Sequence, residues 1–112
     1  MSSSRPIPKP PQTFRDFAAR YPELAKAWEA VQAAEASAGP LDERTRRLIK
    51  LGIAIGARQE GSVHSSVRKG LAQGIPRDEL EQVVALAAGT LGFPATVAAF
   101  AWVREEIAKQ NG

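Results

Sequence analysis

Cysteine is absent from this 112-residue sequence, and histidine occurs only once, as His64. Without cysteine the chain can form no disulfide, no cysteine-ligated zinc site and no thiolate nucleophile, so thiol catalysis is excluded. Glu60 lies four residues before the histidine, and residues four apart share one face of a helix. The two side chains could therefore act on one point, although a plain Glu–His pair near a helix start is the simpler interpretation.

Long apolar runs are also missing. No stretch approaches the roughly 18 apolar residues of a membrane-spanning helix, and the N-terminus lacks the apolar segment of a signal peptide. We therefore expect a cytoplasmic protein that has no membrane partner. The first twelve residues, MSSSRPIPKPPQ, hold four of the eight prolines and no apolar periodicity. They predict a disordered, proline-rich arm over residues 1–12, followed by a single domain over residues 13–112.

Charge of one sign is not concentrated along the chain. Fifteen basic residues are interleaved with twelve acidic ones, for a net charge of +3. The basic cluster consists of Arg44, Arg46, Arg47 and Lys50, which is too narrow for a nucleic-acid interface, so we expect no nucleic-acid partner. A solvated face or a protein interface is the favoured use of this cluster, and attraction of an anionic small molecule is the alternative.

The apolar residues that are present recur at helical spacing, and no alternating strand pattern occurs. We predict an all-α bundle of five to six helices, which begin near Thr13, at Pro22, after Asp42, at Glu60 or Ser62, at Pro76 and near Ala95. Gly52 and Gly56 share one helical face, which predicts that a neighbouring backbone packs closely there. The residues predicted to be buried are Leu48, Leu51, Ile55, Val67, Leu71, Val84, Ala87, Val97 and Phe100.

Three successive segments of the chain resemble a known protein family. They are LDERTRRLIKLGIAIGA, then VRKGLAQGIPRDELEQVV, then GTLGFPATVAAF. Their order and separations over residues 41–100 resemble the carboxymuconolactone decarboxylase family, which includes the alkylhydroperoxidase D-like proteins. The resemblance implies an all-helical protomer that assembles into trimers or hexamers. We expect the helices from Leu80 and from Ala95 to contribute to that interface, because both are rich in alanine and valine.

The redox chemistry of that family does not carry over to this chain. Redox members have a CxxC motif, a histidine four residues after its second cysteine, and a glutamate on the preceding helix. The resemblance places these positions at Gln59, Ser62, Ser66 and Arg47. Serine and glutamine do not replace a peroxide-attacking thiolate, so cysteine-based peroxidase activity is not expected. The chain is thus similar to an atypical member that lacks both the CxxC motif and the family histidine.

The decarboxylase branch also lacks CxxC and keeps the turn Gly92-Phe93-Pro94-Ala95. It carries an acidic residue and a histidine in the loop and short helix. Here the family histidine position is Ser66, whereas His64 lies two residues earlier, about 200° around a helix. Glu60 and His64 could instead be a pair of this chain's own.

Three functions remain open from the sequence. The first is lyase-type acid/base chemistry on a small carboxylate or lactone, with Glu60 and His64 as catalytic residues and Arg47 or Arg58 binding the anionic group. The second is a metal site, but one histidine and one carboxylate supply only two ligands, so a neighbouring protomer or water would have to complete it. We therefore expect no metal ion and no cofactor. The third is a non-catalytic, oligomeric binding or assembly protein.

Overall fold

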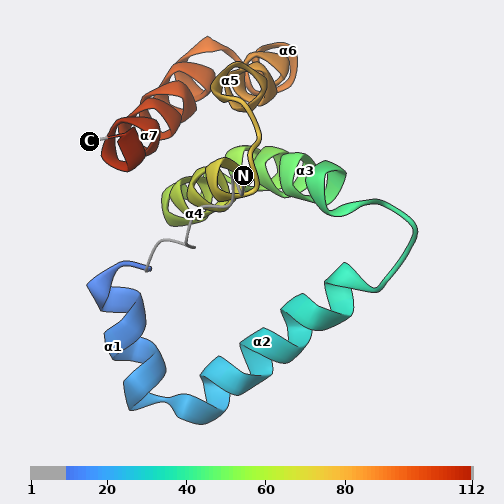
Figure 1. The fold of residues 1–112 in the computed structure, drawn as a ribbon. Helices are drawn as coiled ribbons and strands as arrows, with labels where there is room; N and C mark the ends of the chain where they lie inside the picture. Colours follow the sequence, from blue (N-terminus) through green and yellow to red (C-terminus); the bar gives the residue numbers. More distant parts are fainter. Residues whose placement is uncertain (1–9, 112) are drawn as a thin grey trace. The chain divides into compact units, whose positions relative to one another are not determined.

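The computed structural model describes residues 10–111, and these form helices joined by loops, with no strand. The predicted all-α fold is confirmed (Figure 1). Six helices have nine or more residues, as expected, and α6 is a single extra turn. The helices are α1 (Gln12–Arg20), α2 (Pro22–Ala36), α3 (Glu43–Gly56), α4 (Glu60–Ala72), α5 (Arg77–Leu86), α6 (Ala88–Leu91) and α7 (Phe93–Asn111).

The helix boundaries follow the sequence signals closely. Helix α1 ends just before Tyr21, and Pro22 occupies the first turn of α2, as the restriction on the residue before proline predicts. Helix α4 is followed by Gly74 with a φ of +85°, a conformation that glycine adopts without steric cost. The N–H groups of Gly74 and Ile75 bond to the carbonyls of Leu71 and Gly70, which is the Schellman pattern. Most of the predicted arm, residues 1–9, lies outside the described residues, and its last residue already belongs to α1.

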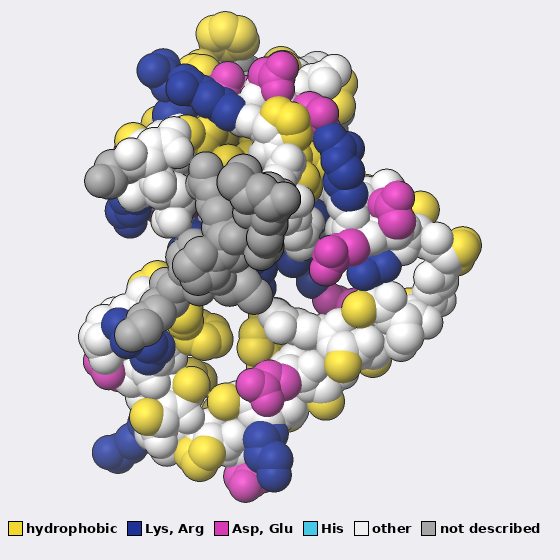
Figure 2. Space-filling model, in the orientation of Figure 1, with side chains coloured by type: hydrophobic (Ala, Val, Ile, Leu, Met, Phe, Trp, Pro, Cys, Tyr) yellow, Lys and Arg dark blue, Asp and Glu magenta, His cyan; other side chains and the backbone are white. Residues whose placement is uncertain are grey.

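The described chain divides into two units, residues 10–43 and residues 44–111. In the first unit, α1 and α2 follow one another, and none of their residues is buried. The rings of Phe17 and Tyr21 pack with centroids 5.1 Å apart. Hydrophobic side chains are visible over α1 and α2 in Figure 2. The large apolar residues exposed on this unit are Phe14, Phe17, Tyr21, Leu24, Trp28, Val31 and Leu41.

The second unit contains the hydrophobic core. Helices α3, α4, α5 and α7 and the loop residue Ile75 supply the buried apolar side chains, and Leu51, Val63, Val67, Leu80 and Val103 are fully inaccessible. Of the residues predicted to be buried, Leu51, Ile55, Val67 and Val84 are buried, whereas Leu48, Leu71 and Ala87 pack against the core while partly exposed.

The prediction was wrong for Val97 and Phe100, which are 50% and 37% exposed. Helix α7 turns a neighbouring stripe toward the core, formed by Thr96, Ala99, Val103, Glu106 and Ile107. A helix with apolar residues on more than one face does not reveal from its sequence which face packs inward. The exposed stripe leaves Val97 and Phe100 available for contacts outside the unit.

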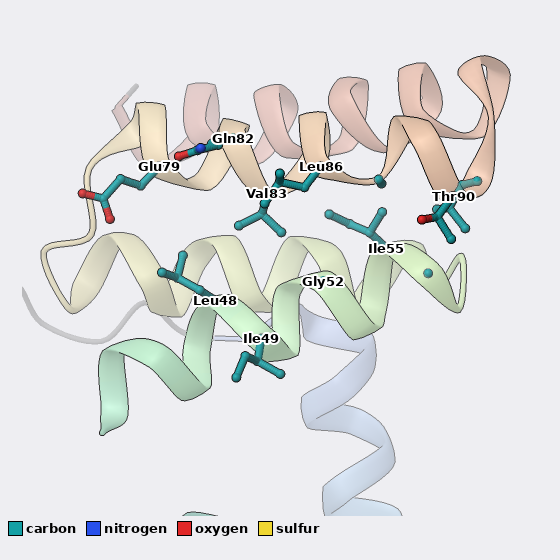
Figure 3. Close-up of a pocket in the computed structure, with 12 residues that line it drawn as sticks. Leu48, Ile49, Gly52, Ile55, Glu79, Gln82, Val83, Leu86 and Thr90 are labelled. Atoms are coloured by element: carbon teal, nitrogen blue, oxygen red, sulfur yellow. The ribbon is translucent and has the colours of Figure 1, made fainter. Parts of the chain in front are cut away.

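An apolar groove runs between α3 on one side and α5 and α6 on the other, with a volume of about 680 Å³ (Figure 3). Gly52 and Gly56 lie in its α3 wall, so the expected close backbone contact is not found there. A Cβ added at Gly52 would meet only the Val83 side chain at 3.8 Å, and one at Gly56 would meet nothing within 4 Å. The glycines therefore widen this groove.

Candidate functional site

Helix α4 carries the predicted pair, and the turn before it sets where the helix begins. Arg58 has a φ of +58°, and the N–H groups of Arg58 and Gln59 bond to the carbonyls of Ile55 and Ala54. This is the Schellman pattern again, here with arginine at the left-handed position. Glu60 then opens α4, which places His64 one turn further along the same face. The side chains of Glu60 and His64 are thus brought together as predicted.

The strongest contact of His64 is with a residue of α7 that the sequence interpretation missed. Its ring Nδ1 lies 2.9 Å from Oε1 of Glu106. The Glu106 side chain is only 2% exposed and that of His64 is 16% exposed. An ionised carboxylate can only accept, so this hydrogen bond requires the proton on Nδ1. In the neutral ring, the lone pair then lies on Nε2.

Three further groups surround the Glu106 carboxylate. Gln110 donates a hydrogen bond from Nε2 to Oε2 of Glu106 at 2.6 Å. The charged nitrogens of Arg68 and Lys109 lie 3.8 and 4.0 Å from the carboxylate oxygens. A buried carboxylate is tolerated only where hydrogen bonds and opposite charges replace lost water. Glu106 is therefore held in place as a fixed acceptor for the imidazole.

The other ring nitrogen of His64 faces two exposed carboxylates. Nε2 lies 3.7 Å from Oε2 of Glu60 and 3.7 Å from Oε1 of Glu105. These side chains are 57% and 60% exposed, so Nε2 is on the solvent side of the ring while Nδ1 is on the buried side. We call His64, Glu60, Glu105 and Glu106 the His64 cluster.

The predicted anion-binding arginines are not part of the His64 cluster. Arg47, on α3, approaches the other side of α4, where its Nη1 lies 3.5 Å from Oγ of the buried Ser66. The resemblance implies that redox members have glutamate and histidine at these two positions, and the fold brings Arg47 and Ser66 together. Arg58 is exposed in the turn before α4. Neither Glu60 nor His64 lines the apolar groove.

The pKa of Lys69 is lowered below its usual 10.5, first by burial and then by the positive charges of Arg47, Lys50 and Arg68. The protonated lysine therefore destabilises the folded state at neutral pH. As the pH rises, the folded protein releases this proton before the unfolded chain does, so stability increases up to about the unfolded pKa.

Replacing Lys69 with methionine is accordingly expected to raise the free energy of unfolding at pH 7 and to flatten its increase in the alkaline range. Urea unfolding between neutral pH and about pH 10 measures both effects. Lys26→Met, at an exposed position of α2, is the control and should leave the pH dependence unchanged. A decrease in stability at pH 7 for Lys69→Met would contradict the assignment.

The sequence did contain a signal for Glu106. Residues 96, 99, 103 and 106 follow the three- and four-residue steps of one helix face, and the first three of them are small or apolar. A glutamate on such a face requires a buried partner. The predicted core of α7 rested on Val97 and Phe100, so Glu106 was not considered.

Within residues 10–111, no helix has both the length and the apolar character that a membrane crossing requires. Neither curated proteins nor solved structures gave a match. The model of the carboxymuconolactone decarboxylase family matches residues 22–105, which is most of the chain and extends from α2 into α7. The protein therefore belongs to the carboxymuconolactone decarboxylase family.

Proposed function

We propose that this family member performs lyase-type acid/base chemistry at Nε2 of His64. The observation that carries the proposal is the 2.9 Å contact between Nδ1 and the buried Glu106 carboxylate. A carboxylate on one ring nitrogen fixes the tautomer and stabilises the imidazolium that forms when the other nitrogen takes up a proton. Glu106 is the positioning residue in this scheme, and His64 transfers the proton.

The charges around Nε2 favour one of the two substrate classes suggested by the sequence. The exposed carboxylates of Glu60 and Glu105 flank this nitrogen, so a substrate carboxylate would be repelled there. A lactone carries no charge and offers acidic protons next to its carbonyl. We therefore favour a small lactone at Nε2. His64 removes a proton next to the carbonyl, the enolate that forms expels a leaving group from the neighbouring carbon, and the imidazolium gives its proton to that group.

A ligand screen tests this function. Small lactones and cyclic carboxylates are screened by thermal shift against the wild-type protein and against His64→Gln, in the presence of a chelator. We expect lactones to stabilise the wild type more than the variant. A ligand that stabilises both proteins equally would make His64 structural and would contradict the proposal.

The second candidate function is a non-catalytic, oligomeric binding protein. It is supported by the apolar groove and by large apolar side chains that α5 and α7 leave exposed. Large apolar patches are rare on the surface of monomeric proteins, and exposed apolar side chains that gather on one face indicate a surface that another protein covers. The exposed residues are Leu86 at the end of α5 and Phe93, Val97 and Phe100 on α7.

Assembly is expected irrespective of catalysis. The wild-type protein should sediment as a trimer or hexamer at micromolar concentration, and Val97→Glu combined with Phe100→Glu should shift it toward monomer, because two charges cannot be buried in an apolar contact without partners. Analytical ultracentrifugation measures both. Leu24→Glu, on α2, tests whether exposed apolar residues of the first unit contribute equally. A wild-type monomer at this concentration would exclude the assembly.

A further inference from the structure

The His64 cluster contains three side chains of types that bind metal ions. Two of them, Glu60 and His64, were paired in the sequence, whereas the third was not connected with them. Glu60 and His64 lie one turn apart on α4, and α7 adds Glu105. One ligand atom from each residue lies within 4.8 Å of the other two. We propose that Glu60, His64 and Glu105 bind a divalent cation of the zinc type through Nε2 and the two carboxylates.

The distances fit such an ion with small side-chain movements. Two ligands at about 2.1 Å from a tetrahedral zinc ion lie about 3.4 Å apart. Nε2 of His64 is 3.7 Å from an oxygen of each glutamate. The three ligand atoms lie within 4.8 Å of one another. Both glutamates are more than half exposed, so their side chains can rotate toward a shared ion without displacing a packed neighbour.

The buried side of the histidine supplies an independent argument. Histidines that bind metals donate their second ring N–H to a carboxylate or carbonyl, which fixes the tautomer and makes the ligating nitrogen more basic. Glu106 occupies that position at Nδ1, and it is itself held by Gln110 and Arg68. The unprotonated Nε2 therefore points between two carboxylates, an arrangement that a cation stabilises.

The ligand set also indicates which cation is favoured. One imidazole with two carboxylates suits zinc and other late divalent ions better than magnesium, which prefers oxygen ligands and retains its water. Three protein ligands leave a fourth position on the exposed side for water. Nε2 cannot hold an ion and transfer a proton at the same time, so bound metal would block the proposed chemistry. The metal site stands on its own geometry, and its test does not depend on activity.

Binding of Zn²⁺ to chelator-treated, full-length protein tests the proposal. Isothermal titration calorimetry should give one Zn²⁺ per chain, with Mg²⁺ far weaker. Because His64 is the only histidine, its two ring nitrogens can be followed by nitrogen-15 NMR without assignment. Addition of Zn²⁺ should shift the Nε2 resonance and leave the Nδ1 proton in place. Zn²⁺ that leaves the Nε2 resonance unchanged would overturn the proposal.

Substitutions distinguish the loss of a metal ligand from the loss of a negative charge elsewhere on the protein. His64→Gln and Glu105→Gln are each expected to weaken Zn²⁺ binding more than tenfold, and Glu106→Gln by about 10- to 100-fold through loss of the supporting carboxylate. The matched control is Glu29→Gln, at an exposed position of α2, which should bind as the wild type does. Circular dichroism verifies that each variant is folded. Equal binding by the wild type and a folded His64→Gln, or no binding by the wild type, would overturn the site.

Discussion

Replacing His64 with glutamine is expected to lower kcat for a lactone substrate by about 10²- to 10⁴-fold, the usual contribution of one positioned acid or base. Glutamine can still bond to Glu106 through its amide but has no nitrogen that exchanges a proton near neutral pH. KM should change less than kcat, because the proton moves in the transition state and not on binding. Initial rates of product formation over a range of lactone concentrations, with a chelator present, give both kcat and KM.

Two further variants distinguish support of proton transfer by the carboxylate at Nδ1 from a general effect of negative charge near the ring. Glu106→Gln keeps an acceptor for Nδ1 but removes the negative charge that stabilises the imidazolium, so kcat should fall while the protein stays folded. Glu105→Gln removes a charge of the same size from the exposed side of the ring, where no short hydrogen bond is lost. We expect it to affect kcat much less than Glu106→Gln. Unchanged kcat in His64→Gln would leave the histidine with a structural role.

The helices could be predicted from the sequence because their end signals are local. Tyr21-Pro22, Asp42 and Gly74 each act within one turn of the chain, and the structure places helix boundaries at all three. The Glu60–His64 pair was predictable for the same reason, since four-residue spacing on one helix fixes proximity. What these signals could not specify is which face of each helix packs inward.

The remaining members of the His64 cluster depend on that packing. Glu105 and Glu106 lie more than forty residues after His64, and only the packing of α7 against α4 brings them to opposite nitrogens of one ring. The sequence does not show which face of α7 packs inward, and this also explains why Val97 and Phe100 were wrongly predicted to be buried. Arg47 was predicted beside His64, but the contact that α3 makes with Ser66 places it on another side of α4. Long-range packing therefore decides the composition of the site.

The largest effect on stability is expected for Glu106→Ala, which should lower the free energy of unfolding by about 3–5 kcal/mol, as removal of one partner of a buried charged pair does. The substitution leaves the guanidinium of Arg68, whose side chain is only 11% exposed, without its nearest opposite charge. It also removes the acceptor of the Nδ1 proton of His64 and the acceptor of the Gln110 amide.

The neighbouring glutamate provides a matched control for this prediction. Glu105→Ala makes the same chemical change one residue earlier on α7, at an exposed position, and should alter stability by about 0.5 kcal/mol or less. Glu106→Gln should fall between the two, because its amide oxygen still accepts from Nδ1 while the charge is lost. Urea unfolding of the three variants at neutral pH gives the comparison. If Glu106→Ala and Glu105→Ala were equally stable, Glu106 could not be the fixed carboxylate that orients His64, since a buried acceptor with four charged or polar partners cannot be removed without cost.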